Sequence, residues 1–254
     1  MTIALITGAS SGIGREFARL LAPSHDLILT ARSADALNSL ASEFSGHGHI
    51  VRVIAADLST EEGVAKVLAD VQDIDILINN AGVGDFGPFA DAAPAKLDQM
   101  IALNIATLTS LSRAYLPGML AKKSGRILNV ASTAAFQPGP LMAVYYATKA
   151  YVLSFSEALA EETRGTGVTV TALCPGPTES GFQAGAAMES SKLVNGKKMP
   201  TSAEVAKFGV KAMQAGKVVA VPGFMNKIMA SSIRFSPRPA VRRLVHKMQE
   251  STDH

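Results

Sequence analysis

Short apolar runs alternate with longer segments of helical periodicity along the whole chain. Runs of a few apolar and β-branched residues, bounded by glycine or polar residues, are typical of strands that are buried on both faces. We expect seven such strands, at residues 3–6, 27–29, 50–55, 74–78, 126–130, 168–173 and 218–221.

The segments between these runs repeat apolar residues at the spacing of an α-helix. Ile101, Ile105, Leu108 and Tyr115 are separated by four, three and seven residues, which places them on one helical face. A second helix is predicted from about residue 145 to residue 164. Its buried face comprises Val152, Phe155 and Leu159.

Strands that alternate with crossover helices predict an α/β fold: a Rossmann-like, doubly wound parallel sheet of about seven strands with helices on both faces. Ligands of such sheets bind beyond the carboxyl ends of the strands. Asn79 and Ser132 each follow a predicted strand directly. The polar candidates therefore fall at the edge where a ligand is expected.

Length and composition fit one folded unit. The 254 residues, of which 48% are hydrophobic and 18% charged, suffice for one sizeable core, and no linker or internal repeat divides the sequence. We therefore expect a single domain over residues 1–254. The segment at about 176–200 breaks the alternation, and we interpret it as a mobile substrate lid. The alternative is a surface insert without function.

Cysteine usage bears on the compartment. Cys174 is the single cysteine, so no internal disulfide can form, and the first residues lack the pattern of a secretory signal. No run approaches the roughly 18 apolar residues that a membrane-spanning helix requires. These features predict a cytoplasmic protein.

Positive charge collects in a basic C-terminal extension at about 224–254, although the formal net charge is only +3. A solvated helix face or a subunit contact is the favoured interpretation. Binding to nucleic acid is not expected, and contact with an anionic membrane surface is the less favoured alternative. The cations concerned are Lys227, Arg234, Arg238, Arg242, Arg243 and Lys247.

A glycine-rich turn joins the first predicted strand to the following helix. Its glycines permit a tight turn, the approach of backbone N–H groups to phosphate, and close packing of the helix. The N-terminal end of that helix adds a positive dipole for a pyrophosphate. The turn therefore predicts a dinucleotide site, and a turn without a ligand is the alternative. The residues predicted to bind the cofactor here are Gly8, Ser10, Ser11, Gly12, Ile13, Gly14 and Arg15.

The end of the second strand indicates which dinucleotide is bound. An acid at this point would hydrogen-bond the ribose 2′-hydroxyl and repel a 2′-phosphate, but the chain has Arg32 and Ser33. A guanidinium attracts phosphate, and Arg15 is a second cation near the glycine turn. We therefore predict NADP(H) in preference to NAD(H). The alternative for Arg32 is an ordinary exposed arginine.

Two further segments follow the third and fourth strands. Asp57, which precedes Leu58, can accept a hydrogen bond from the adenine amino group, or it can cap the helix that begins nearby. Asn80, Ala81 and Gly82 place small side chains and amides where a bulky residue would collide with the adenosine. We predict no metal site.

A hydroxyl, a phenol and an amine are spaced for proton transfer to a carbonyl. Tyr145 and Lys149 lie at i and i+4 of a predicted helix and so share one face. Lys149, together with the positive nicotinamide of the oxidised cofactor, is expected to lower the phenol pKa from about 10. Tyr145 then acts as acid or base, and Ser132 donates to the same substrate oxygen. Tyr146 also lies close to Lys149 in sequence.

Asn104 is the fourth catalytic candidate. It is expected to hold a water that links Lys149 to solvent, and a buried structural asparagine is the alternative. The residues expected to face the substrate are mostly apolar, which favours a hydrophobic carbonyl compound over a phosphorylated sugar. They are Phe86, Phe136, Gln137, Leu141, Met142 and Phe182.

Together these motifs resemble the short-chain dehydrogenase/reductase family, in its NADPH-preferring branch, over most of the chain. The resemblance implies that Tyr145 is the acid/base, that Ser132 is the substrate-oxygen donor and that Asn104 belongs to a proton relay. It further implies that Lys149 binds the nicotinamide ribose and that the chain forms a homodimer or homotetramer. The residues that carry the resemblance are Gly8 to Gly14, Asp57, Asn79 to Gly82, Asn104, Ser132, Tyr145, Lys149, Pro175, Gly176, Pro177 and Thr178.

The same resemblance places Pro175, Gly176 and Thr178 beside the nicotinamide. The predicted function is reversible, NADPH-dependent reduction of an apolar ketone, aldehyde or oxoacyl compound to an alcohol. A different class of protein, an NADP(H)-binding regulator or scaffold without turnover, is the alternative. The combination of Ser132, Tyr145 and Lys149 argues against it, because a protein that only binds the cofactor needs no acid.

Overall fold

The computed structural model describes residues 2–46, 48–188, 191–193, 195–196 and 198–250. Over these residues, seven strands form one parallel sheet in the order β3-β2-β1-β4-β5-β6-β7. All seven predicted strands are present, and the prediction of a doubly wound, Rossmann-like sheet is confirmed. The strands are β1 (Ile3–Thr7), β2 (Asp26–Ala31), β3 (Val51–Ala55), β4 (Ile76–Asn79), β5 (Gly125–Val130), β6 (Val168–Leu173) and β7 (Val219–Ala220).

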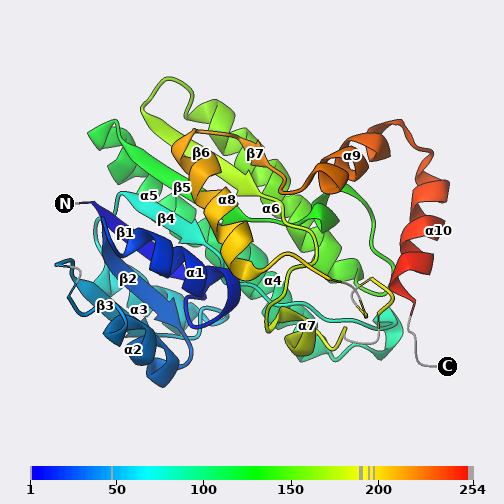
Figure 1. Ribbon diagram of the computed structural model, residues 1–254, viewed down its shortest axis with the longest axis horizontal. Coiled ribbons are helices and arrows are strands. Elements are labelled where there is room, and N and C mark those ends of the chain that lie inside the picture. Colours follow the sequence, from blue (N-terminus) through cyan, green and yellow to red (C-terminus); the bar gives the residue numbers. More distant parts are fainter. Residues whose placement is uncertain (1, 47, 189–190, 194, 197, 251–254) are drawn as a thin grey trace.

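Both faces of the sheet are covered by helices, which explains why most strand residues are apolar. On β1, Ile6 packs in a core with helices α1, α2 and α8, whereas Leu5 packs on the opposite face with α3 and α5. Helix α6 covers the same face as α5, farther along the sheet (Figure 1). These helices are α1 (Gly12–Leu21), α2 (Ala34–Ser42), α3 (Glu61–Asp70), α5 (Leu108–Lys122), α6 (Ala143–Glu162) and α8 (Ser202–Gln214).

The remaining elements lie at the carboxyl end of the sheet or beyond β7. Figure 1 shows α9 and α10 at the edge of the molecule opposite the N-terminus, and α7 below the sheet. Among the described residues, none of the helices is long and apolar enough to cross a membrane. The elements are η1 (Phe89–Asp91), α4 (Pro94–Ile101), η2 (Ala102–Thr107), η3 (Thr133–Phe136), α7 (Phe182–Gly185), α9 (Phe224–Ser232), η4 (Ile233–Phe235) and α10 (Arg238–Gln249).

The helix predicted around residue 101 is not continuous. A π-helical turn, η2, separates α4 from α5. A π turn adds a residue and rotates the preceding helical face relative to the following one. Ile101 is therefore 46% exposed, whereas Leu108 and Tyr115 are buried, and the prediction that they share a buried face is wrong for Ile101. The predicted helix at 145–164 is present as α6, with Val152 fully buried.

The predicted lid and C-terminal extension each contain helices. Within the lid region, 176–200, α7 is the helix that the structure describes; residues 189–190, 194 and 197 lie outside the described part. The extension, 224–254, contains α9 and α10, and its residues 251–254 also lie outside. The six predicted cations of this extension are all exposed.

Candidate active site

A cavity of about 560 Å³ opens at the carboxyl edge of the sheet. The order of strands reverses between β1 and β4, which is the position where open α/β sheets bind ligands. Three predicted site residues, Gly14, Arg15 and Asn104, lie behind the cavity wall and contact residues that line it. The predicted residues that line it directly are Gly8, Ser10, Ser11, Gly12, Ile13, Arg32, Ser33, Asp57, Leu58, Asn80, Ala81, Gly82, Ser132, Tyr145, Lys149, Pro175, Gly176 and Thr178.

The glycine turn forms a cradle because its glycines carry no side chains. Gly8 has a φ of 66° and Gly12 a φ of 53°, a conformation that other residues rarely adopt. A Cβ at Gly8 would lie 2.8 Å from Asn80 Nδ2, and one at Gly14 would collide with the Gly8 carbonyl. The Asn80 amide donates to the Thr7 and Gly8 carbonyls at 3.0 and 3.2 Å. Asn80 therefore fixes the turn through its side chain.

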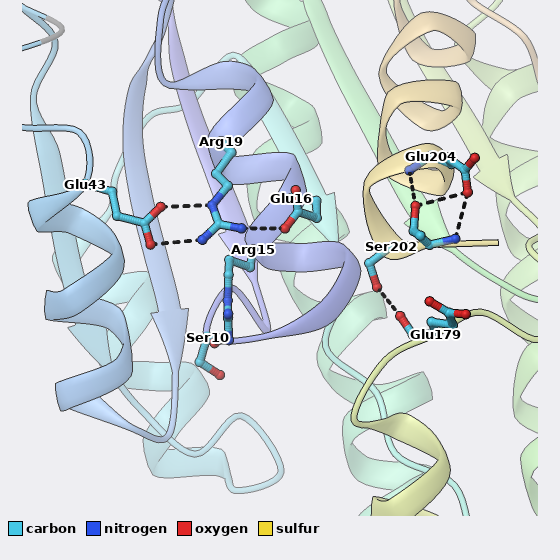
Figure 2. Close-up of polar contacts among 9 residues, drawn as sticks. Ser10, Arg15, Glu16, Arg19, Glu43, Glu179, Ser202 and Glu204 are labelled. Atoms are coloured by element: carbon cyan, nitrogen blue, oxygen red, sulfur yellow. Dashed lines mark hydrogen bonds and ion pairs between the residues drawn. The ribbon is translucent and has the colours of Figure 1, made fainter. Parts of the chain in front are cut away.

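The cradle fits a dinucleotide phosphate. Helix α1 begins at Gly12, and its N-cap residue, Ser11, makes no side-chain capping hydrogen bond. The first backbone N–H groups of a helix lack partners within the helix, so they can donate to a phosphate at this end. Arg15, on the first turn of α1, donates to the Ser10 carbonyl at 2.9 Å. Figure 2 labels both residues at the start of this helix.

The adenosine end of the cavity carries both predicted selectivity residues. Arg32 lies exposed at the rim, and Ser33 Oγ caps α2 by accepting from Ala36 N at 3.3 Å. Asp57 Oδ1 accepts from Ser59 Oγ at 2.7 Å and from Ser59 N at 2.9 Å. These bonds, aided by the positive charge of Arg32, hold the Asp57 pKa below its usual range. Thr60 caps α3, so Asp57 is not the helix cap.

Ser132, Tyr145 and Lys149 converge on the inner part of the cavity. Ser132 follows β5; its hydroxyl accepts from Ala134 N at 3.1 Å and donates to the Pro175 carbonyl at 3.4 Å, and it lies near enough to the Tyr145 phenol to lower the pKa of that phenol. Lys149, one turn after Tyr145 on α6, places Nζ 5.7 Å from the centre of the Tyr145 ring. Figure 1 shows α6 running alongside the sheet, and the hydrogen bond from Lys149 Nζ to the Val130 carbonyl places this lysine at the carboxyl end of β5.

The protein's own groups do not lower the pKa of Tyr145 as the sequence suggested. Burial raises the pKa of Tyr145 to about 12, and the nearby Ser132 hydroxyl only partly offsets this effect. The Lys149 ammonium, which donates to the Val130 carbonyl at 2.7 Å, does not outweigh this effect of burial. Burial also lowers the pKa of Lys149 to about 8. Tyr145 is therefore held in its proton-donating form.

Comparison with known proteins identifies the family. The family model described as short chain dehydrogenase matches residues 2–190. The chain belongs to the short-chain dehydrogenase family. The uncharacterized oxidoreductase YvrD of Bacillus subtilis is 42% identical over 180 residues, which cover 69% of this chain and 68% of YvrD. This dehydrogenase is accordingly an oxidoreductase that acts on CH–OH and C=O groups.

Two solved structures resemble the dehydrogenase over its full length. The short-chain dehydrogenase from Sphingobium yanoikuyae in complex with NADPH has a TM-score of 0.84 and 28% identity, and the match covers 100% of this chain and 98% of that one. The bulky-bulky ketone specific alcohol dehydrogenase from Comamonas testosteroni has a TM-score of 0.81 and 27% identity, with 100% and 96% covered.

Asn104 of the dehydrogenase is buried in the π turn with its amide fully engaged. Its Oδ1 accepts from Val83 N at 3.0 Å, and its Nδ2 donates to Val83 O at 2.9 Å and to Thr148 Oγ1 at 3.0 Å. A Cβ built on Gly82 would approach both Asn104 Oδ1 and Lys149 Nζ, at 3.1 and 3.5 Å. Asn104 thus ties the loop after β4 to α6, close to the lysine.

Tyr146 is not available as the acid. Its ring is buried and lines the cavity, but its hydroxyl accepts from Gln249 Nε2 at 2.6 Å and lies near the Gln137 side chain. Burial raises its pKa above the range of ordinary tyrosines. Asn79, at the end of β4, donates to Asn129 and Ser112 inside the core rather than to a ligand.

The substrate end of the cavity differs in part from the prediction. Met142 and Phe182 line it, whereas the other four predicted residues do not. Phe136 is directed away by η3 and packs in the cluster that contains Val152. Leu141 lines a separate small hollow, Phe86 packs behind Tyr145 and Phe182, and Gln137 lies near Tyr146.

Several lining residues were missed. Lys96 and Gln99 come from α4, and no sequence motif marks them. At Gly84 the glycine itself was a possible sequence signal of close packing. A Cβ there would lie 2.7 Å from the Phe182 ring, so the absence of a side chain allows Phe182 to approach. Met188 and Leu193 line the cavity from within the segment that was predicted to be a lid.

Proposed function

We propose that this dehydrogenase reduces an apolar ketone, aldehyde or oxoacyl compound to an alcohol, reversibly, and uses NADPH in preference to NADH. The observation that carries the proposal is the convergence of Ser132, Tyr145 and Lys149 on the cavity that the glycine turn also lines. The proposed site for the dinucleotide phosphates and a half-buried acid thus share one cavity.

The cofactor preference rests on the adenosine end. The loop after β2 carries Arg32 and no acid, and Arg32 stands exposed where it can reach a 2′-phosphate. Arg15 adds a second positive charge near Ser10. A guanidinium binds phosphate through charge-assisted hydrogen bonds, whereas a ribose hydroxyl gives it little advantage. The NADPH bound to the Sphingobium enzyme supports the same preference.

The proton chemistry follows from the three side chains. NADPH, when bound, supplies the hydride to the carbonyl carbon. Tyr145 donates its proton to the carbonyl oxygen, while the Ser132 hydroxyl donates a hydrogen bond to the same oxygen and polarises it. The ammonium of Lys149 stabilises the phenolate that Tyr145 becomes, and it returns a proton toward that phenolate through solvent near Asn104. Alcohol oxidation reverses each of these transfers.

Apolar walls favour a hydrophobic substrate. Met142 and Phe182 lie beside Tyr145, and Met188 and Leu193 close the same end of the cavity. The ring centres of Phe182 and Tyr145 are 5.2 Å apart. Such a wall binds hydrocarbon and offers few partners to a polyhydroxylated or phosphorylated compound. The ketone specificity of the Comamonas enzyme agrees with this substrate class.

We also propose that the enzyme is a homodimer or homotetramer that meets its copies through the helices around η2. Ile101, which directly precedes η2, is a large apolar side chain that is 46% exposed, and a subunit contact would cover it. Light scattering coupled to gel filtration measures the assembly, and Ile101→Lys is expected to weaken it.

The test of the proposed function is NADPH and NADH oxidation against a panel of apolar ketones, aldehydes and oxoacyl esters. We expect turnover with NADPH, with a kcat/KM at least tenfold higher than with NADH. Tight NADPH binding without turnover of any compound in the panel would contradict the reductase assignment.

A further inference from the structure

The C-terminal helix α10 forms the outer wall of the substrate end, although it is far from the catalytic residues in sequence. Val241 and Val245 on α10 pack in one apolar cluster with Met142, Tyr146 and Met188. Those three residues line the cavity. The position of α10 therefore bears directly on the shape of the space that a substrate enters.

Gln249, the last residue of α10, makes the polar link within this contact. Its side chain has 0% exposure, and its Nε2 donates to Tyr146 Oη at 2.6 Å. The bond to Gln249 therefore joins the end of α10 to the Tyr146 hydroxyl. Gln249 Oε1 has no hydrogen-bond partner within the described part of the chain. The hydrogen bond to Tyr146 therefore stabilises the buried Gln249 amide in this position.

The same end of α10 also holds the predicted lid. Lys192 N donates to the Glu250 carbonyl at 3.0 Å, and Lys192 Nζ pairs with the Glu250 carboxylate at 2.8 Å. Ser191 Oγ donates to the Gln249 carbonyl at 3.4 Å. Leu193, which follows directly, lines the cavity. One turn of α10 thus contacts Tyr146 on one side and the lid on the other.

The base of the lid is fixed independently of α10. Glu179 N donates to the Pro200 carbonyl at 2.9 Å, and Ser202 Oγ donates to the Glu179 carbonyl at 2.8 Å (Figure 2). Thr201 and Glu204 form a capping box that begins α8 at this point. A change at Gln249 therefore leaves the two ends of the lid in place and acts on the part that lines the cavity.

We propose that Gln249 is a positioning residue for substrate specificity: by bonding Tyr146 and contacting the lid at Ser191, it sets the width of the cavity between Tyr146 and Leu193. The proposal rests on the proposed reductase function. It predicts that loss of the bond impairs the binding of bulky ketones, whereas small aldehydes, which do not span this width, are unaffected. The NADPH site at the glycine turn is also unaffected.

The experiment compares Gln249→Leu, Tyr146→Phe and the double variant, with benzophenone as the bulky ketone and propanal as the small aldehyde. Gln214→Leu is the matched control, because Gln214 is the last residue of α8 and is exposed. We expect each single variant to raise KM for benzophenone by about 5- to 10-fold, the effect of one hydrogen bond, and to leave the Kd of NADPH unchanged; Gln249→Leu, which lies outside the cavity lining, is also expected to leave kcat for propanal unchanged.

The double variant separates positioning from general loosening. Both substitutions remove the same bond, so its KM for benzophenone is expected to match that of the single variants. A double variant whose KM for benzophenone rises by the product of the two single effects would overturn the proposal. An equal rise of KM for benzophenone and propanal would also overturn it. Should Gln249→Leu not fold, as judged by its melting curve, Tyr146→Phe alone carries the comparison between the two substrates.

A binding measurement keeps this inference separate from the proposed function. In a protein that does not turn benzophenone over, quenching of NADPH fluorescence reports the binding of benzophenone to the NADPH complex. If the parent protein reduces no compound, the reductase assignment fails, and the benzophenone Kd of the variants still decides the role of Gln249. An unchanged Kd in both single variants would exclude that role.

Discussion

The ammonium of Lys149 donates a 2.7 Å hydrogen bond to the backbone carbonyl of Val130, at the end of β5. Lys149 is only 6% exposed, and burial lowers its pKa from 10.5 to about 8. The enzyme therefore keeps a cation where desolvation opposes it, next to the phenol that must give up a proton. This relationship has consequences for stability and for the dependence of the rate on pH.

Lys149→Met is expected to stabilise the fold while it abolishes turnover. Because the folded pKa is lowered, the unfolded chain binds more protons between about pH 8 and 10.5, and the stability of the parent rises with pH across that window. Below pH 8 the buried charge of Lys149 lowers the free energy of unfolding of the parent by its full amount, about 3 kcal/mol from the pKa shift alone. Loss of the bond to Val130 reduces the gain of the variant to about 1–2 kcal/mol.

Urea unfolding at several pH values measures this effect. The gain is expected to be largest at pH 7 and to shrink as the pH rises from 8 toward 10. A variant that is less stable than the parent at pH 7 would show that the lysine is not desolvated as the structure indicates.

Carbonyl reduction is expected to slow above about pH 8. As Lys149 loses its proton, it no longer stabilises the phenolate that forms when Tyr145 donates. The measurement is kcat/KM for ketone reduction between pH 6 and 10, with Lys149→Arg beside the parent. The guanidinium stays charged, so the variant, although slower, lacks the fall near pH 8. The same fall in both proteins would assign it to another group.

Arg32→Ala is expected to weaken NADPH binding by about 1.5–3 kcal/mol, the range for hydrogen bonds to a charged group, and to leave NADH nearly unchanged. Fluorescence titration with each cofactor gives both dissociation constants. Arg52→Ala is the control, because Arg52 pairs with Asp70 on the surface outside the cavity. Equal losses of affinity for NADPH and NADH would show that Arg32 does not select between the two cofactors.

Two glycine-to-alanine substitutions are expected to have contrasting effects: one abolishes NADPH binding, and the other stabilises the fold. In Gly14→Ala the new methyl group meets the Gly8 carbonyl and Asn80, so the turn must distort and NADPH binding is lost. Gly118→Ala lies on the exposed face of α5, with its nearest neighbour at 3.7 Å, and is expected to stabilise the protein by about 1 kcal/mol. Melting temperatures and NADPH titrations of both variants test this contrast. Tight binding by Gly14→Ala would contradict the proposed cradle.

Local sequence signals predicted the sheet and many of the residues that line the cavity. Gly8 and Gly12 adopt positive φ values, which glycine tolerates because it has no Cβ. The apolar runs of β1 and β4 reflect burial on both faces. The i, i+4 spacing placed Tyr145 and Lys149 on one face of α6. Each of these features depends on residues that are close together in the chain.

Features that depend on distant segments were not predictable in this way. The bond between Tyr146 and Gln249 joins residues 103 positions apart. The direction of Phe136 depends on η3, and the exposure of Ile101 depends on the π turn that follows it. The pKa of Tyr145 reflects burial by the folded chain, which spacing on a helix does not reveal.

The most direct test of the central claim is the rate of NADPH oxidation by Tyr145→Phe with a ketone that the parent reduces. Tyr151→Phe is the control, because Tyr151 lies on the same helix and bonds Thr109 outside the cavity. We predict that Tyr145→Phe lowers kcat by about 100-fold or more with an unchanged Kd for NADPH, and that Tyr151→Phe keeps the parent rate. A Tyr145→Phe enzyme that retains the parent kcat would contradict the assignment of Tyr145 as the acid.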